Sequence, residues 1–257
     1  MADLLQAAAF VLVLIGLGAV LLHGASGLGY NWQWNRVTRY LLIRDAAGWQ
    51  FGPLLKGLGL TLEITLASLG LSLLIGLCTA LMRLSASPMA RGIARVYLEL
   101  IRNTPLLIQI FVLYFVFAPI LDLGRFSSAV IALSLFEGSY ASEIIRAGIL
   151  AIPVGQWEAA ASLGLPRKQT YRHIILPQAL RQMTPPLTSQ GISLVKDSAL
   201  VSTIAIYDLT MQGQQIIAET FLTFEIWFTV AAIYLAVTML LSILVKYLEN
   251  HLTKYQH

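Results

Sequence analysis

Several ionisable side chains lie inside long apolar stretches of this 257-residue sequence, and each of them needs a partner, a wet cavity or a function. Glu137 follows an apolar run that begins near Ser127, and a rise of about 1.5 Å per residue puts its carboxylate near the middle of a bilayer. Two interpretations stay open for Glu137: a packing contact with an arginine or a serine, or contact with a transported molecule. Glu143 and Arg146 are three residues apart on the same predicted helix, so we expect them to form a structural pair.

A second polar group lies in the last third of the chain. Gln190, Ser193 and Asp197 follow the spacing i, i+3 and i+7, which puts them on one face of a helix, and Lys196 and Ser198 flank the last of them. Such a stripe can hydrogen-bond a zwitterion. Two interpretations stay open here as well: the stripe lines a substrate pathway or gate, or Lys196 and Asp197 form an internal clamp that closes an external gate.

Other chemistries lack their residues. The sequence contains no Gly-x-x-x-x-Gly-Lys-Ser/Thr phosphate loop, no His-Glu-x-x-His motif and no Gly-x-Ser-x-Gly motif, so we expect neither ATP hydrolysis nor another enzyme activity in this chain. Cys78 is the single cysteine, which excludes a disulfide framework and a multi-cysteine metal site. We therefore expect no metal site and no cofactor bound by this chain itself.

The elements that position these residues are predicted to cross a membrane. Hydrophobic residues make up 57% of the chain and charged residues only 12%, against roughly 25% charged in a soluble domain. Because the apolar blocks are about as long as a helix that crosses a bilayer, the sequence predicts an all-α integral membrane protein. About six transmembrane helices are expected, near residues 4–22, 54–82, 96–119, 127–152, 183–206 and 224–247. The fifth contains Pro185, Pro186 and Gly191, so we expect a broken span there.

The distribution of basic residues predicts the orientation. Lysine and arginine gather in the loops 83–95 and 153–181 and in the tail after residue 246, and the positive-inside rule therefore puts both termini in the cytoplasm. The formal charge of +4 is explained by this topology signal, and we expect no nucleic-acid partner. Residues 1–52 are expected to form an extra helix and an external aromatic connector, and residues 53–257 the transmembrane domain.

The loop 153–181 lies between the fourth and fifth predicted spans and has a helical pattern of its own. Glu158 suits a helix start because its charge complements the helix dipole, and alanines follow it. Gly164 and Pro166 are signals that end a helix. We predict a short cytoplasmic helix that opens at Glu158 and closes near Gly164.

This loop resembles the signature loop of bacterial ATP-binding-cassette import permeases. The stretches 102–111, 140–149 and 196–202 are similar to the polar amino-acid branch of that family. The matching positions of the signature loop are Glu158, Ala159, Ala160, Gly164, Ile174, Leu176 and Pro177.

The resemblance implies the type I import permease fold and a place in the bacterial inner (cytoplasmic) membrane. It also implies that the signature loop couples the chain to a cytoplasmic ATPase dimer, which would bind ATP and Mg²⁺. The other partners it implies are a second permease subunit, identical or paralogous, and a periplasmic amino-acid-binding protein. Because position 190 is the neutral Gln190, the few carboxylates favour glutamate, aspartate or their amides as substrates. A secondary transporter driven by an ion gradient is the alternative, although the chain shows no repeat symmetry.

Overall fold

The computed structural model describes residues 29–45 and 48–253, together with residues 6, 11–13, 15–16, 18–20 and 24. The extra helix predicted over residues 4–22 therefore lies largely outside the described residues. The remaining elements, in chain order, are η1 (Trp34–Arg36), α2 (Thr38–Leu41), β1 (Leu42–Asp45), β2 (Gly48–Phe51), α3 (Pro53–Leu84), α4 (Pro88–Arg102), α5 (Leu106–Phe111), η2 (Val112–Phe117), α6 (Ala118–Leu121), α7 (Arg125–Leu150), α8 (Val154–Ser162), α9 (Arg167–Thr170), η3 (Tyr171–Ile175), α10 (Leu176–Asp197), η4 (Ser198–Ile204), α11 (Leu209–Thr220) and α12 (Thr223–Thr253).

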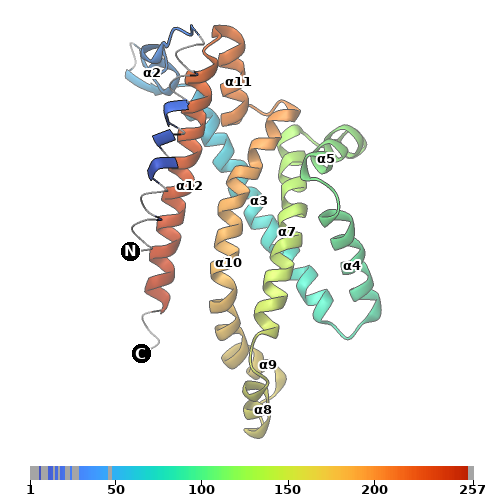
Figure 1. Cartoon of the computed structure of the whole chain (residues 1–257). Coiled ribbons are helices and arrows are strands. Elements are labelled where there is room, and N and C mark those ends of the chain that lie inside the picture. Colours follow the sequence, from blue (N-terminus) through green and yellow to red (C-terminus); the bar gives the residue numbers. More distant parts are fainter. Residues whose placement is uncertain are drawn as a thin grey trace.

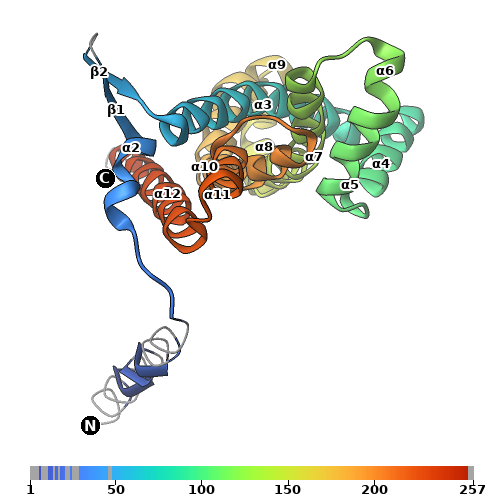
Figure 2. The same cartoon turned by 90° about the horizontal axis from the view of Figure 1, so that it is seen from above.

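Long helices that run lengthwise make up most of the molecule, and α8 and α9 extend beyond their ends on one side (Figure 1). Among the described residues, α3, α7 and α12 are long and apolar enough to cross a membrane. Helices α4 to α6 pass the same test as a pair, but the pair is bent by 105°. Seen from above, α4, α5 and α6 lie at one end of the bundle, while α12 lies toward the opposite end (Figure 2).

The bend between α4 and α5 falls inside the straight span predicted over residues 96–119. Pro105 precedes α5, and a proline disfavours helical backbone in the residue before it. The Nε2 atom of Gln109 donates to the carbonyls of Ile101 and Thr104, at 2.8 Å each. The side-chain amide of Gln109 therefore satisfies carbonyl groups that lose their helical partners at the bend.

Helices α3 and α7 pack closely against each other. A Cβ atom added at Gly76 would lie 2.7 Å from the Cβ of Ala141, and one at Gly138 would lie 2.8 Å from the Cγ2 of Ile75. The Oγ of Ser134 on α7 donates to the carbonyl of residue 68 on α3 at 3.2 Å. Small residues let two membrane helices approach this closely, and the contact brings the middle of α7 into the core.

The interruption predicted at Pro185, Pro186 and Gly191, within the span 183–206, does not occur. Helix α10 is continuous from Leu176 to Asp197 and contains both Pro185 and Pro186. Prolines are tolerated in membrane helices where side chains and neighbouring helices rebond the backbone. Irregular backbone occurs instead at the two ends of α10, in η3 and η4.

The segment before α3 folds onto the start of α12. The hydroxyl of Tyr30 donates to Oε2 of Glu225 at 2.5 Å, and the backbone N–H of Gln33 donates to Oε1 at 2.7 Å. Strands β1 and β2 form an antiparallel hairpin in which Leu42 pairs with Phe51. This hairpin departs from the all-helical pattern expected, and it leaves Trp49 70% exposed.

Candidate functional site

Helix α8 stands at one extreme of the molecule, away from the long helices (Figure 1). It begins at Val154, directly after Pro153, so the prediction that Glu158 opens the helix is wrong. Proline suits the start of a helix because no intrahelical partner is available for its missing N–H, and here it begins α8 one turn earlier. Glu158 and Ala159 are exposed in the second turn, whereas Ala160 is buried.

Helix α8 ends as the sequence predicts. Gly164 has a φ of +69°, a left-handed conformation that glycine adopts without strain. The N–H of Gly164 donates to the carbonyl of Ala161 at 2.9 Å, and the N–H of Leu165 donates to that of Ala160 at 3.1 Å. These two bonds form a Schellman motif, which turns the chain sharply and satisfies the last carbonyls of α8.

The second half of the signature loop packs against α8 through η3. The ring of Trp157 on α8 packs edge-on against Tyr171 of η3, with centroids 5.1 Å apart. Ile174 is half-buried and packs against a core cluster around Ile175. The remaining two predicted coupling residues, Leu176 and Pro177, are exposed at the start of α10.

The structure therefore divides the seven predicted coupling residues into two groups. Glu158, Ala159 and Gly164 lie on the exposed surface of α8 and its turn. Two apolar side chains join them there, with Val154 68% exposed and Leu163 76% exposed. The others anchor α8 or begin the helix that follows it. The arrangement can offer a small, mainly apolar knob to another protein.

A second group of predicted residues meets between α7 and α10. Glu137 is only 2% exposed, and its Oε2 accepts a hydrogen bond from Nε2 of Gln190 at 2.6 Å. Its other oxygen, Oε1, is buried without a partner. Asp197, at the end of α10, lies close enough to Glu137 for the two carboxyl groups to interact directly. These three side chains form the carboxylate cluster.

The other predicted pathway residues lie beside the carboxylate cluster rather than in it. Lys196 is exposed and forms no ion pair with Asp197, so the clamp, one of the two interpretations left open, is not formed in this structure. The hydroxyl of Ser198 donates to the carbonyl of Val195 at 2.8 Å. Ser193 is half-buried on α10.

Glu143 pairs with two arginines. Nη2 of Arg146 lies 2.5 Å from Oε1 of Glu143, as expected for residues three apart on one helix. Arg83, at the end of α3, also pairs with this carboxylate. Sequence reasoning missed Arg83 because it is 60 residues away in the chain.

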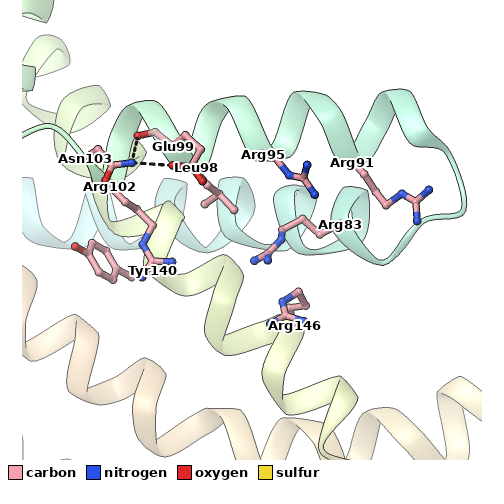
Figure 3. Close-up of a pocket in the computed structure, with 9 residues that line it drawn as sticks. All are labelled: Arg83, Arg91, Arg95, Leu98, Glu99, Arg102, Asn103, Tyr140 and Arg146. Atoms are coloured by element: carbon pink, nitrogen blue, oxygen red, sulfur yellow. Dashed lines mark hydrogen bonds between the residues drawn. The ribbon is translucent and has the colours of Figure 1, made fainter.

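A cavity of about 570 Å³ opens next to this pair, between α3, α4 and α7. Figure 3 shows the arginines of these helices extending toward the space between them. The guanidinium of Arg102 lies over the ring of Tyr140, 5.2 Å from its centroid. Sequence reasoning used these arginines only as a topology signal, although the spacing of Arg91, Arg95 and Arg102 puts them on one helix face. The lining residues, here called the arginine pocket, are Arg83, Arg91, Arg95, Leu98, Glu99, Arg102, Asn103, Tyr140 and Arg146.

Comparison with known proteins identifies the family of this chain. Residues 72–254 match the family described as the binding-protein-dependent transport system inner membrane component. The chain belongs to this family. The permease is 39% identical over 211 residues to the glutamine transport system permease protein GlnP of Escherichia coli K12. The matched region covers 80% of this chain and 96% of the relative. It is 40% identical over 214 residues to the L-cystine transport system permease protein TcyB of Bacillus subtilis, covering 82% of this chain and 92% of the relative.

A solved structure supports the same assignment. The crystal structure of an amino acid ABC transporter with histidines superposes with a TM-score of 0.73 at 37% identity, covering 77% of this permease and 94% of that chain. The type I import permease fold implied by the signature loop is therefore confirmed. The permease is a multi-pass membrane subunit of an amino acid ABC importer, in which a separate subunit provides the ATPase activity. The alternative of a transporter driven by an ion gradient is therefore wrong.

Proposed function

We propose that the permease imports a polar amino acid, with glutamate, aspartate or their amides as its substrates, through the inner membrane of a bacterium. A cytoplasmic ATPase dimer that binds ATP and Mg²⁺ drives the cycle through α8. A second permease subunit, identical or paralogous, completes the membrane channel. A periplasmic amino-acid-binding protein delivers the substrate.

The observation that carries this proposal is the geometry of α8. The helix lies beyond the long helices, its side chains at Val154, Glu158 and Ala159 are exposed, and its end is closed by the left-handed turn at Gly164. An exposed helix with small side chains can enter a groove on another protein. Its tie to η3 through Trp157 and Tyr171 passes a force on α8 to α10, since η3 leads directly into that helix.

The substrate assignment rests on the carboxylate cluster. Glu137 has one buried oxygen without a partner, and Asp197 lies beside it. Two carboxyl groups at one place attract a cation, and the ammonium group of a zwitterionic amino acid supplies one. The third member of the cluster, Gln190, is neutral and donates an amide hydrogen to Glu137. Few carboxylates are therefore left to bind a second, cationic group, such as the side chain of arginine or lysine. The relative GlnP is a glutamine transport system permease protein, which agrees with this class.

The proposal is tested by transport in proteoliposomes that contain the permease, its ATPase and its binding protein. We expect ATP-dependent uptake of labelled glutamine or glutamate. Glu137→Gln should lower uptake by about tenfold to a hundredfold, the effect of losing one hydrogen bond to a charged group. Glu219→Gln, which changes an exposed carboxylate on α11, is the matched control and should transport normally.

Two results would contradict the proposal. Uptake that persists without the ATPase and follows an ion gradient would exclude ATP coupling. Normal uptake by the Glu137→Gln variant, with normal retention of the ATPase, would exclude the carboxylate cluster as the substrate contact.

A further inference from the structure

The arginine pocket carries more positive charge than its own carboxylates neutralise. Five arginines line it, and Glu99 is the one acidic residue among the lining residues. Glu143 lies beside the pocket and pairs with Arg83 and Arg146. Glu99 is engaged by the amide of Asn103, whose Nδ2 donates to its Oε2 at 2.9 Å. The three remaining arginines, Arg91, Arg95 and Arg102, form no ion pair with any residue that the structure describes.

Two of the three arginines without an ion-pair partner in the part of the chain that the structure describes are close neighbours. Arg91 and Arg95 are one helical turn apart on α4, and neither forms an ion pair there. Like charges at this spacing repel each other. Their side chains extend over the space between α4 and Arg83 (Figure 3). A bound anion would relieve this repulsion.

The opposite face of α4 is apolar and exposed. Met89 is 76% exposed, Ile93 51%, Val96 59% and Leu100 65%. An exposed apolar face on a membrane helix suits the hydrocarbon of lipid. The turn between α3 and α4 belongs to the loop 83–95 that the positive-inside rule assigns to the cytoplasmic side. An anion bound in the arginine pocket would therefore lie next to the acyl chains of the cytoplasmic leaflet.

We propose that the arginine pocket binds the phosphate group of an anionic phospholipid from the cytoplasmic leaflet, with the acyl chains along the apolar face of α4. Guanidinium groups bind phosphate oxygens in pairs of parallel hydrogen bonds, and basic pockets between membrane helices on the cytoplasmic side hold lipid headgroups. The cavity volume of about 570 Å³ is in the range of ordinary ligand pockets. This site is separate from the carboxylate cluster and does not depend on which amino acid is transported.

The test measures lipid retention by the full-length chain. The protein is placed in nanodiscs of phosphatidylcholine with phosphatidylglycerol, released into detergent, and analysed for bound lipid by native mass spectrometry. Wild type should retain phosphatidylglycerol in preference to phosphatidylcholine. The double variant Arg91→Gln, Arg95→Gln should lose about thirtyfold in affinity for it, at roughly fivefold per arginine near the surface.

The matched control is Arg39→Gln, Arg44→Gln, which removes the same charge from the exposed connector and should retain phosphatidylglycerol as wild type does. Arg91→Lys, Arg95→Lys keeps the charge without the paired donors, and should lose less than the glutamine variant even if that variant folds poorly. Equal retention by wild type and the glutamine variant would overturn the proposal. Thermal stabilisation by inorganic phosphate equal to that by phosphatidylglycerol would overturn the assignment to a lipid. Reduced glutamate uptake in the glutamine variant with unchanged lipid retention would assign the pocket to the substrate instead.

Discussion

Gly164→Ala tests whether the turn that ends α8 is needed for ATP coupling. Gly164 has a φ of +69°, and no heavy atom outside its local backbone lies within 4 Å of an added Cβ. The penalty of alanine is therefore conformational rather than steric, about 1–2 kcal/mol for an L-residue in the left-handed region. This free energy corresponds to roughly a fivefold to thirtyfold lower population of the native turn. Asparagine adopts this conformation more easily than alanine, so Gly164→Asn should be milder.

The assay compares ATP-dependent uptake and co-purification of the ATPase across a series. We expect activity to fall in the order Gly164, Gly164→Asn, Gly164→Ala and Gly164→Val, because a β-branched residue is least tolerated at positive φ. Gly155→Ala is the matched control. Gly155 lies inside α8 with open space around its Cβ position, where alanine favours the helix.

Two results would refute this reasoning. Equal activity of the alanine, asparagine and glycine proteins would show that the turn does not limit coupling. A loss that follows side-chain volume, with asparagine worse than alanine, would show that close approach of the ATPase matters at this position instead of the backbone conformation.

Two further predictions concern packing and protonation. Gly138→Ala should destabilise the detergent-solubilised permease by about 1–3 kcal/mol, the usual cost of overpacking, because its Cβ would lie 2.8 Å from a side chain of α3. Gly59→Ala, in open space inside α3, should keep or raise the melting temperature because alanine favours a helix. Equal melting of both variants would contradict the packing argument. Burial raises the pKa of Asp208, between η4 and α11, to about 6. The hydrogen bond that its carboxylate accepts from the N–H of Met211 lowers this pKa, but burial has the larger effect. The folded protein therefore holds a proton between pH 4 and 6 that the unfolded chain has lost, so the stability due to this group falls as pH rises through that window and is constant above it. Stability curves of wild type and Asp208→Asn should differ in slope between pH 4 and 6, and parallel curves would exclude the shift.

Features that depend on neighbouring residues could be predicted from the sequence. The end of α8 follows from a glycine that tolerates positive φ, and the contact of Glu143 with Arg146 follows from helical spacing. The membrane class follows from composition, since apolar blocks of this length have no other stable environment. The start of α8 was misplaced because Pro153 determines it rather than the charge of Glu158.

Only the tertiary structure decided which distant side chains meet. Glu137 and Gln190 are 53 residues apart, and Tyr30 and Glu225 are 195 residues apart. No local pattern encodes such pairs, because they depend on how closely helices approach and how each is rotated about its axis. Here small residues on α3 and α7 determine the approach of those two helices. The continuity of α10 through Pro185 and Pro186 was also decided by the tertiary structure, since a membrane helix packed among others can tolerate prolines that would break an isolated helix.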